Sequence, residues 1–143
     1  MTLIELLIVL VIVGILAGVA WPSFREMVHK SRRADAMSAL TEIMQAQERW
    51  RANNPAYKAA LSSPALPGAR TTSQAGHYAL AITADSATAT AYTATATVIG
   101  TSPQASDSNC QVMRVLISGG NIAYSSGASA NATNNPPDPC WVR

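Results

Sequence analysis

The stretch 6–24 contains no charged residue and consists mainly of leucine, isoleucine and valine. A helix of this length and composition can cross the hydrocarbon core of a bilayer. A cleaved signal peptide is the main alternative, because Gly18 and Ala20 are small residues at plausible positions before a cleavage site. Signal peptides begin with a basic segment, whereas the first basic residue here is Arg25. We therefore expect a membrane-spanning helix.

The residues after Pro22 show a helical pattern instead of a uniformly apolar one. Apolar side chains and one glutamine recur there at steps of three and four: Val28, Met37, Leu40, Met44, Gln47 and Trp50. Charged residues lie largely between them: Arg25, Lys30, Arg32, Arg33, Glu42 and Glu48. Asn53-Asn54-Pro55 should end this amphipathic helix. A continuous helix over 2–52 would be about 75 Å long, so part of it must project from a head of this size.

The remaining chain, 53–143, predicts a small head with an antiparallel sheet of about four strands. We expect an irregular connection over 53–76, with one helical turn at Tyr57–Leu61, because Pro and Gly interrupt it. A β-meander over 77–124 follows from period-two alternation. Its inward residues are Tyr78, Leu80 and Ile82, then Tyr92, Ala94, Ala96 and Val98, then Met113, Val115 and Ile117. The predicted class is α+β, with a membrane segment 1–24, a packing helix 25–52 and the head.

The chain has two cysteines, Cys110 and Cys140. An even pair behind an export-like N-terminus predicts a disulfide formed in an oxidising compartment, closing a loop over 110–140. Two free buried thiols are the alternative. Closing a loop of this length stabilises a fold by about 3 to 4 kcal/mol in the chain-entropy model.

Glu5 is the one charged side chain before Arg25. A carboxylate in hydrocarbon costs about 3 kcal/mol, so it usually has a partner or a function. It could pair with the α-amine of Met1 in its own chain. Alternatively, it could accept the amine of an identical neighbour and so fix the axial offset between two helices. Helix association within lipid gains little hydrophobic energy, which lets one charge pair decide the alignment.

The N-terminal sequence MTLIELLIVLVIVGILAGVAWPSF resembles the start of a mature type IV pilin. That family has Phe or Met at position 1, then Thr2, Leu3, Ile4 and Glu5, and a long apolar stretch with Gly14 and Pro22. Every one of these positions matches. Phe24, where tyrosine is frequent, and Trp21 depart from common members. The resemblance implies a ladle-shaped fold with the helix, meander and late cysteine pair found here.

The resemblance also implies a function and partners. We expect a subunit that polymerises with identical copies, with Met1, Thr2 and Glu5 as assembly residues. A leader already removed by a prepilin peptidase, a methylated amine on Met1, and an ATPase-driven assembly machine belong to the same expectation. The protein would reside in the bacterial inner membrane and then in an extracellular pilus serving motility, adhesion or DNA uptake.

Family filaments lose helical order between the positions that correspond to Gly14 and Pro22. Gly costs about 1 kcal/mol and Pro about 3 kcal/mol in a helix interior, and Gly18 adds to this. We expect a non-helical stretch there in the filament and a more helical one in the membrane.

Other function classes receive little support from the sequence. No metal-ligand spacing, phosphate loop or paired nucleophile and base occurs, so we expect no enzyme, no metal and no cofactor. His29, His77, Asp85, Asp107 and Asp138 lie singly. The basic stripe HKSRRAD could bind DNA or anionic lipid, but such a run is more often a solvated face or a subunit contact. A minor pilin and a type II secretion pseudopilin remain alternatives to a major subunit, and a DNA-binding competence pilin is a further one.

Overall fold

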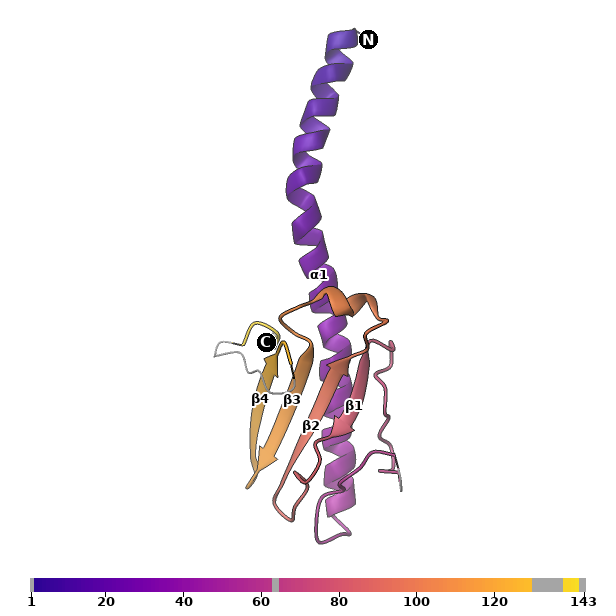
Figure 1. Ribbon diagram of the computed structural model, residues 1–143, viewed down its shortest axis with the longest axis vertical. Helices are drawn as coiled ribbons and strands as arrows, with labels where there is room; N and C mark the ends of the chain where they lie inside the picture. Colours follow the sequence, from indigo (N-terminus) through magenta and orange to yellow (C-terminus); the bar gives the residue numbers. More distant parts are fainter. Residues whose placement is uncertain (1, 63–64, 130–137, 142–143) are drawn as a thin grey trace.

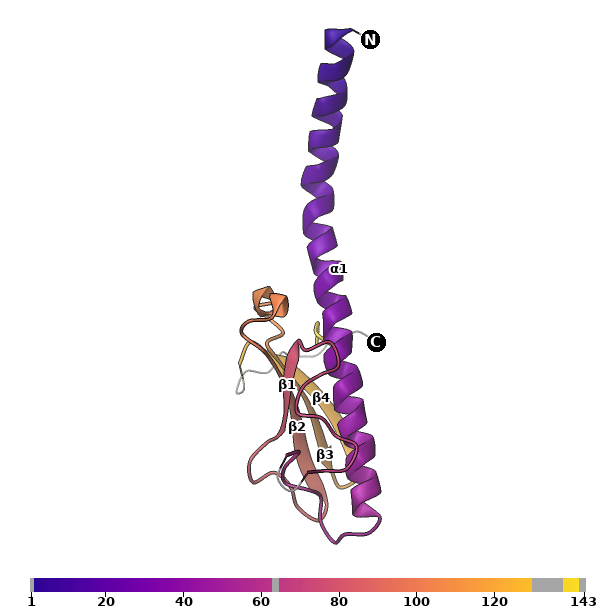
Figure 2. The ribbon, with the colours of Figure 1, turned by 90° about the vertical axis from the view of Figure 1, so that its right-hand side faces the viewer.

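One long helix and one four-stranded sheet make up the computed structural model of the chain, which describes residues 2–62, 65–129 and 138–141. The elements are the helix α1 (Leu3–Arg51), strands β1 (Tyr78–Ile82), β2 (Ala91–Val98), β3 (Val112–Ser118) and β4 (Asn121–Gly127), and a short 3-10 helix η1 (Pro103–Ser106). The second half of α1 packs on one face of the sheet, and its first half projects beyond the head (Figures 1 and 2). The predicted α+β, ladle-shaped architecture is confirmed.

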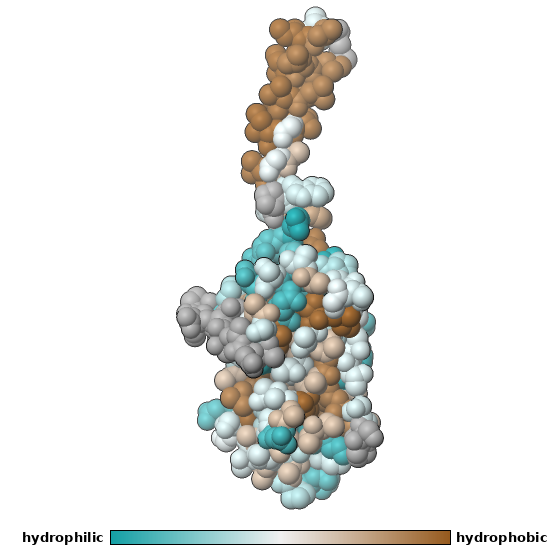
Figure 3. Space-filling view, in the orientation of Figure 1, coloured by the Kyte–Doolittle hydropathy of each residue, from teal (hydrophilic) through white to brown (hydrophobic). Residues whose placement is uncertain are grey.

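The projecting half of α1 is the one helix in the described residues that is long and apolar enough to cross a membrane. Its best 18-residue window has a mean hydropathy of 3.0, and none of that window is buried within the chain. Figure 3 shows the rod as an almost uniformly hydrophobic column above a mixed, largely polar head. An isolated chain therefore needs lipid or other helices around this segment.

The sheet is antiparallel with the strand order β1-β2-β3-β4, as expected of a meander. Its registers place the predicted inward residues opposite one another; Leu80, for example, pairs with Ala96, which pairs with Met113. All ten predicted inward side chains are buried: Tyr78, Leu80, Ile82, Tyr92, Ala94, Ala96, Val98, Met113, Val115 and Ile117. Gly119 and Gly120 have positive φ values of 56° and 82°, which lets the β3–β4 turn close over two residues.

The core lies between the sheet and residues 36–47 of α1. Ala36, Leu40 and Ile43 are fully buried, and the small side chains of Ala39 and Ala46 let the helix approach the sheet closely. The buried stripe is therefore centred slightly away from the predicted one: Leu40 and Gln47 are buried as expected, whereas Val28, Met37, Met44 and Trp50 lie at its margins and are half-buried. The prediction gave alanine too little weight as a contact residue.

The connection after α1 contains no helical turn at Tyr57–Leu61, so that prediction is wrong. The buried amide of Gln47 fixes this segment instead. Its Nε2 donates to the carbonyl of Lys58 at 2.8 Å, and its Oε1 accepts from the Lys58 N–H at 2.9 Å. These two bonds occupy the backbone groups that a helical turn would use. The helical turn that does form, η1, is capped by Ser102 and starts with Pro103.

Candidate functional site

The N-terminal tip of α1 carries the predicted assembly residues Thr2 and Glu5, which form a capping box. The Glu5 N–H donates to Thr2 Oγ1 at 3.4 Å, and the Thr2 N–H donates to Glu5 Oε2 at 3.3 Å. The signal T-x-x-E was present in the sequence and predicts this arrangement. Met1, the predicted methylation site and amine donor, lies outside the described residues. Glu5 therefore has a role within its own chain besides any pairing between chains.

Gly14, Gly18 and Pro22 all lie within the continuous helix α1. A Cβ at either glycine would meet nothing within 4 Å, so neither glycine serves a close contact inside this chain. The property that distinguishes these glycines is therefore that they weaken the helix. Loss of helix over 14–22 concerns the filament and stays a prediction.

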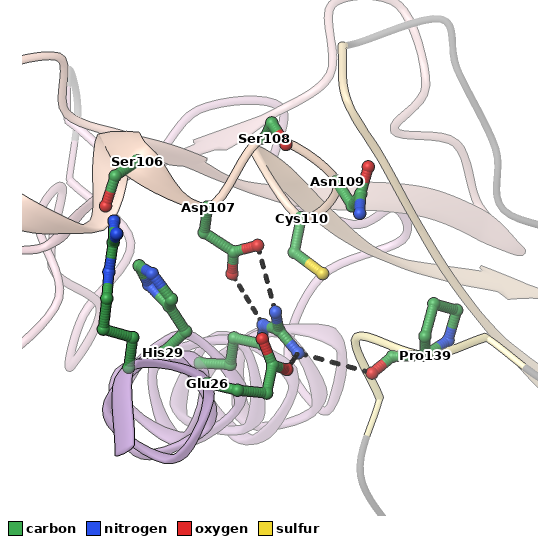
Figure 4. A pocket seen from close by; sticks show the side chains of 10 residues that line it. Glu26, His29, Ser106, Asp107, Ser108, Asn109, Cys110 and Pro139 are labelled. Atoms are coloured by element: carbon green, nitrogen blue, oxygen red, sulfur yellow. Dashed lines mark hydrogen bonds and ion pairs between the residues drawn. The ribbon is translucent and has the colours of Figure 1, made fainter. Parts of the chain in front are cut away.

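The neck, where α1 enters the head, is organised by a buried ion pair that the sequence did not predict. Arg33 Nε donates to Asp107 Oδ2 at 2.7 Å and Nη2 donates to Oδ1 at 3.0 Å, with both side chains 5% exposed. Arg33 Nη1 also lies 3.3 Å from Glu26 Oε1 and donates to the carbonyl of Pro139 at 3.5 Å; dashed lines in Figure 4 mark these contacts. The prediction of a solvated Arg33 and an isolated Asp107 is wrong. Both side chains are buried, and the attraction between them offsets the free-energy cost of removing each charge from water.

Electrostatics at the neck follow from this pair. Burial alone lowers the pKa of Arg33, but the hydrogen bond and the charge of Asp107, together with Glu26, outweigh it, so the pKa is raised and Arg33 stays charged. Beside the pair, burial raises the pKa of Tyr78 to about 12. Gln104 links the pair to the helix, since its Nε2 donates to Asp107 and its Oε1 contacts His29 Nδ1 at 3.2 Å.

A pocket of about 360 Å³ opens at the neck between α1, η1 and the C-terminal segment. Ser106, Ser108, Asn109 and Pro139 surround it, with the Arg33–Asp107 pair at one side (Figure 4). Arg33, Asp107 and Glu26, which line the pocket, are paired with one another, whereas Arg25, a further lining residue, forms no ion pair among the described residues. Three of the four charged side chains around the pocket thus serve a structural contact.

The predicted disulfide between Cys110 and Cys140 is present, with both residues buried. It joins the start of β3 to the C-terminal segment. That segment also contacts β4: Trp141 Nε1 donates to the Ser125 carbonyl at 3.0 Å, and its ring lies 4.7 Å from that of Tyr124. Residues 130–137 of the predicted loop lie outside the described residues.

The last turn of α1 and the segment that follows it lie at the end of the head opposite the N-terminus (Figure 1), and basic and aromatic residues alternate in this part of the sequence. We call Arg49, Trp50, Arg51, Tyr57 and Lys58 the pole cluster. The Lys58 ammonium lies 4.6 Å from the centre of the Trp50 ring, and the Arg51 guanidinium lies 5.3 Å from that of Tyr57. Among the residues that the structure describes, no ion pair involves Arg49, Arg51 or Lys58. The signal RWRANNPAYK was in the sequence, because basic residues interleaved with aromatics indicate nucleic-acid contacts.

An acidic residue, Glu48, contacts the pole cluster. Tyr57 Oη donates to Glu48 Oε1 at 3.0 Å, and Glu48 is exposed. With Arg49, Arg51 and Lys58 against this carboxylate, the pole cluster and Glu48 together carry a formal charge of +2. Within the described part of the chain no three His, Cys, Asp or Glu side chains are arranged to hold a metal ion.

A projecting apolar helix with a capped carboxylate tip, carrying a four-stranded head closed by a late disulfide, defines a subunit of the type IV pilin class. Comparison with known families agrees: residues 1–21 match the prokaryotic N-terminal methylation motif. Residues 22–114 match the family described as type IV minor pilin ComP, DNA uptake sequence receptor. The chain belongs to this minor pilin family, which is a family of structural proteins. No curated protein matches the chain.

Proposed function

We propose that this chain is a minor subunit of a type IV pilus that enters the filament through its projecting helix and binds DNA at the pole cluster. The observation that carries the first part is the bare rod: none of its apolar window is buried within the chain, and single residues such as Leu3 and Val19 are 86% and 73% exposed. In the membrane, lipid covers them. In a filament, the helices of other pilin subunits, identical copies included, would do so.

Glu5 supplies the alignment in this proposal. Its capping bond to the Thr2 N–H uses one carboxylate oxygen at a long 3.3 Å, so the group keeps capacity for a further donor. That donor would be the N-terminal amine of a neighbouring subunit, methylated at Met1. A charge pair formed away from water is strong enough to select one axial offset among apolar helices that otherwise slide freely.

Two substitutions separate this pairing from the capping box. Glu5→Gln keeps a capping hydrogen bond, because Gln serves at the third helical position, but it removes the charge. Thr2→Ala removes the cap and leaves the charge. We expect Glu5→Gln to lower the amount of this subunit in sheared filaments at least 10-fold at an unchanged membrane level, and Thr2→Ala, which keeps the charge, to lower it by a clearly smaller factor. Normal assembly of Glu5→Gln would overturn the pairing.

The family description and the pole cluster support the DNA-binding part. Arg49 and Lys58 can contact phosphates, and the tip of the head is the part farthest from the membrane anchor (Figure 1). The basic stripe first considered at 29–35 is a weaker candidate, because Arg33 is buried against Asp107. The inner membrane, the prepilin peptidase and the assembly machinery are the other partners that this function needs.

The DNA-binding test compares two pairs of charge removals in the full-length chain held in detergent micelles. Arg49→Gln with Lys58→Gln should weaken binding of a labelled duplex about 10-fold and reduce the salt dependence of the affinity by up to about two counterions. Lys30→Gln with Arg32→Gln removes the same charge at the neck and should leave the affinity unchanged. The opposite result would assign DNA binding to the neck and contradict the proposal.

A further inference from the structure

A pocket of about 320 Å³ lies beside the pole cluster, between the end of α1 and the loop at Pro67. It is lined by Ala46, Arg49, Trp50, Asn53, Asn54 and Pro67. Its volume is at the lower end of the range for small-molecule sites, which suits a single planar ring system. An aromatic ring, a guanidinium and two primary amides around such a volume are the groups that contact a base and its phosphate.

The Trp50 side of the pocket is held in place by the chain. The indole is half-buried, and the Lys58 ammonium lies over its ring. Lys58 is itself anchored, because its backbone N–H and carbonyl both bond to the fully buried amide of Gln47. A fixed aromatic face loses little conformational entropy when a ring stacks on it, so this arrangement is prepared for binding.

The polar groups of the pocket divide into anchored and available ones. Asn54 Nδ2 donates to the Trp50 carbonyl at 2.8 Å, and the Asn54 carbonyl accepts from Arg51 at 2.6 Å, so this turn is rigid. The side-chain amide of Asn53 has no hydrogen-bond partner among the described residues and is exposed. Arg49 lies against Gly68: a Cβ added to Gly68 would stand 3.1 Å from Nη2 of Arg49. The donors of Asn53 and Arg49 thus remain open to a ligand.

We propose that this pocket holds one unpaired DNA base stacked on Trp50, with the Asn53 amide bonded to the base edge and Arg49 bonded to the adjoining phosphate. The inference rests on the DNA binding proposed above and adds a contact that depends on the base. An asparagine amide pairs best with adenine, to which it can donate and from which it can accept. An intact duplex would have to extrude the base, so strands with an unpaired adenine should bind more tightly.

The test uses the full-length chain in detergent micelles and three labelled DNAs: a duplex, the same duplex with one bulged adenine, and that bulge made abasic. We expect the bulged adenine to bind about 10-fold more tightly than the other two. Trp50→Leu, which keeps apolar bulk, and Asn53→Ala, at an exposed position, should each abolish that preference. Trp21→Leu, on the projecting rod, is the matched control and should keep it.

Fluorescence gives a second readout in a variant with Trp21 and Trp141 replaced by Phe. Stacking of the bulged adenine should quench the emission of Trp50, and the abasic DNA should not. Equal binding of all three DNAs by the wild-type chain, or a preference that survives in Trp50→Leu, would overturn the base pocket while leaving DNA binding in place. If the wild-type chain bound none of the three DNAs, the proposed DNA-binding function itself would be overturned.

Discussion

Arg33 and Asp107, which stand 74 positions apart in the sequence, meet at the neck in a two-bond ion pair of 2.7 and 3.0 Å. The same guanidinium reaches the carbonyl of Pro139, next to Cys140. One helical side chain therefore contacts both arms of the disulfide-bonded segment. Both this arginine and the disulfide therefore attach that segment to the rest of the head.

Removal of one partner should destabilise the head strongly. Asp107→Ala leaves a buried guanidinium with Glu26 as its one charged partner among the described residues, and we expect the free energy of unfolding to fall by about 3 kcal/mol. Glu26→Gln, at the exposed side of the same arginine, should cost less than about 1 kcal/mol. Denaturant unfolding of the full-length chain in micelles measures both. Equal losses in the two variants would show that burial of the pair is not what matters.

Alkaline pH should destabilise the head through Tyr78. Burial raises its pKa to about 12, above the ordinary value of 10 for the unfolded chain. Below pH 10 the Tyr78 hydroxyl is protonated in both the folded and the unfolded chain, so the stability is at its full value. Between pH 10 and 12 this hydroxyl loses its proton in the unfolded chain and keeps it in the folded chain. The free energy of unfolding should therefore fall by up to about 1.4 kcal/mol per pH unit in this window. Burial also raises the pKa of Tyr92, so Tyr78→Phe should reduce the slope of stability against pH between pH 9 and 11.5 without abolishing it, and an unchanged slope would contradict the assignment.

Two tyrosines in ring contact should respond differently to loss of their hydroxyls. Tyr57 and Tyr92 have ring centroids 4.6 Å apart, yet Tyr57 Oη bonds to Glu48, whereas the buried Tyr92 Oη has no partner among the described residues. Tyr92→Phe should leave the free energy of unfolding unchanged or raise it by up to about 1 kcal/mol, because a polar atom is no longer buried unpaired. Tyr57→Phe should lower it by less than about 1 kcal/mol. A clear loss in Tyr92→Phe would point to a hydrogen bond made by its hydroxyl.

Opening the disulfide should remove a large part of the head's stability. Cys110 and Cys140 are 30 positions apart, and closing such a loop stabilises the fold by about 3 to 4 kcal/mol. The double variant with both cysteines changed to Ser should therefore lose about that much of its free energy of unfolding, as measured by denaturant unfolding. Reduction of the wild-type chain should reproduce the result, and a shift below about 1 kcal/mol would mean that Arg33 and Trp141 hold the segment without the bridge.

Most elements of this fold can be predicted from local patterns in the sequence. Strict alternation fixed which faces of β1, β2 and β3 are buried, and an uncharged run predicted the projecting half of α1. The burial of Arg33 could not be predicted in the same way. Local periodicity places it among solvated charges, whereas its partner, Asp107, follows η1 and is distant in the sequence. Tyr57–Leu61 failed for a similar reason: the side chain of Gln47, from the preceding helix, claims the backbone of Lys58.

The candidate sites divide along the same line. Glu5, the glycines and the cysteines were found from motif and composition, and the capping box could have been found from T-x-x-E. The pole cluster was also written in the sequence, but its significance depends on the turn at 52–58 bringing Lys58 back over Trp50. A contact between residues on either side of a turn becomes visible only once that turn is known.

The unbroken course of α1 has a mechanical consequence. Because the projecting rod and the core helix of the head are one hydrogen-bonded element from Leu3 to Arg51 in this structure, a pull on the anchored end is carried into the residues that pack on the sheet for as long as residues 14–22 stay helical. The bridge and ion pair at the neck lie beside this line of force. In the filament, where we expect residues 14–22 to lose helical order, that stretch would extend first, and only the helix from the neck to Trp50 would carry the load as one rigid element.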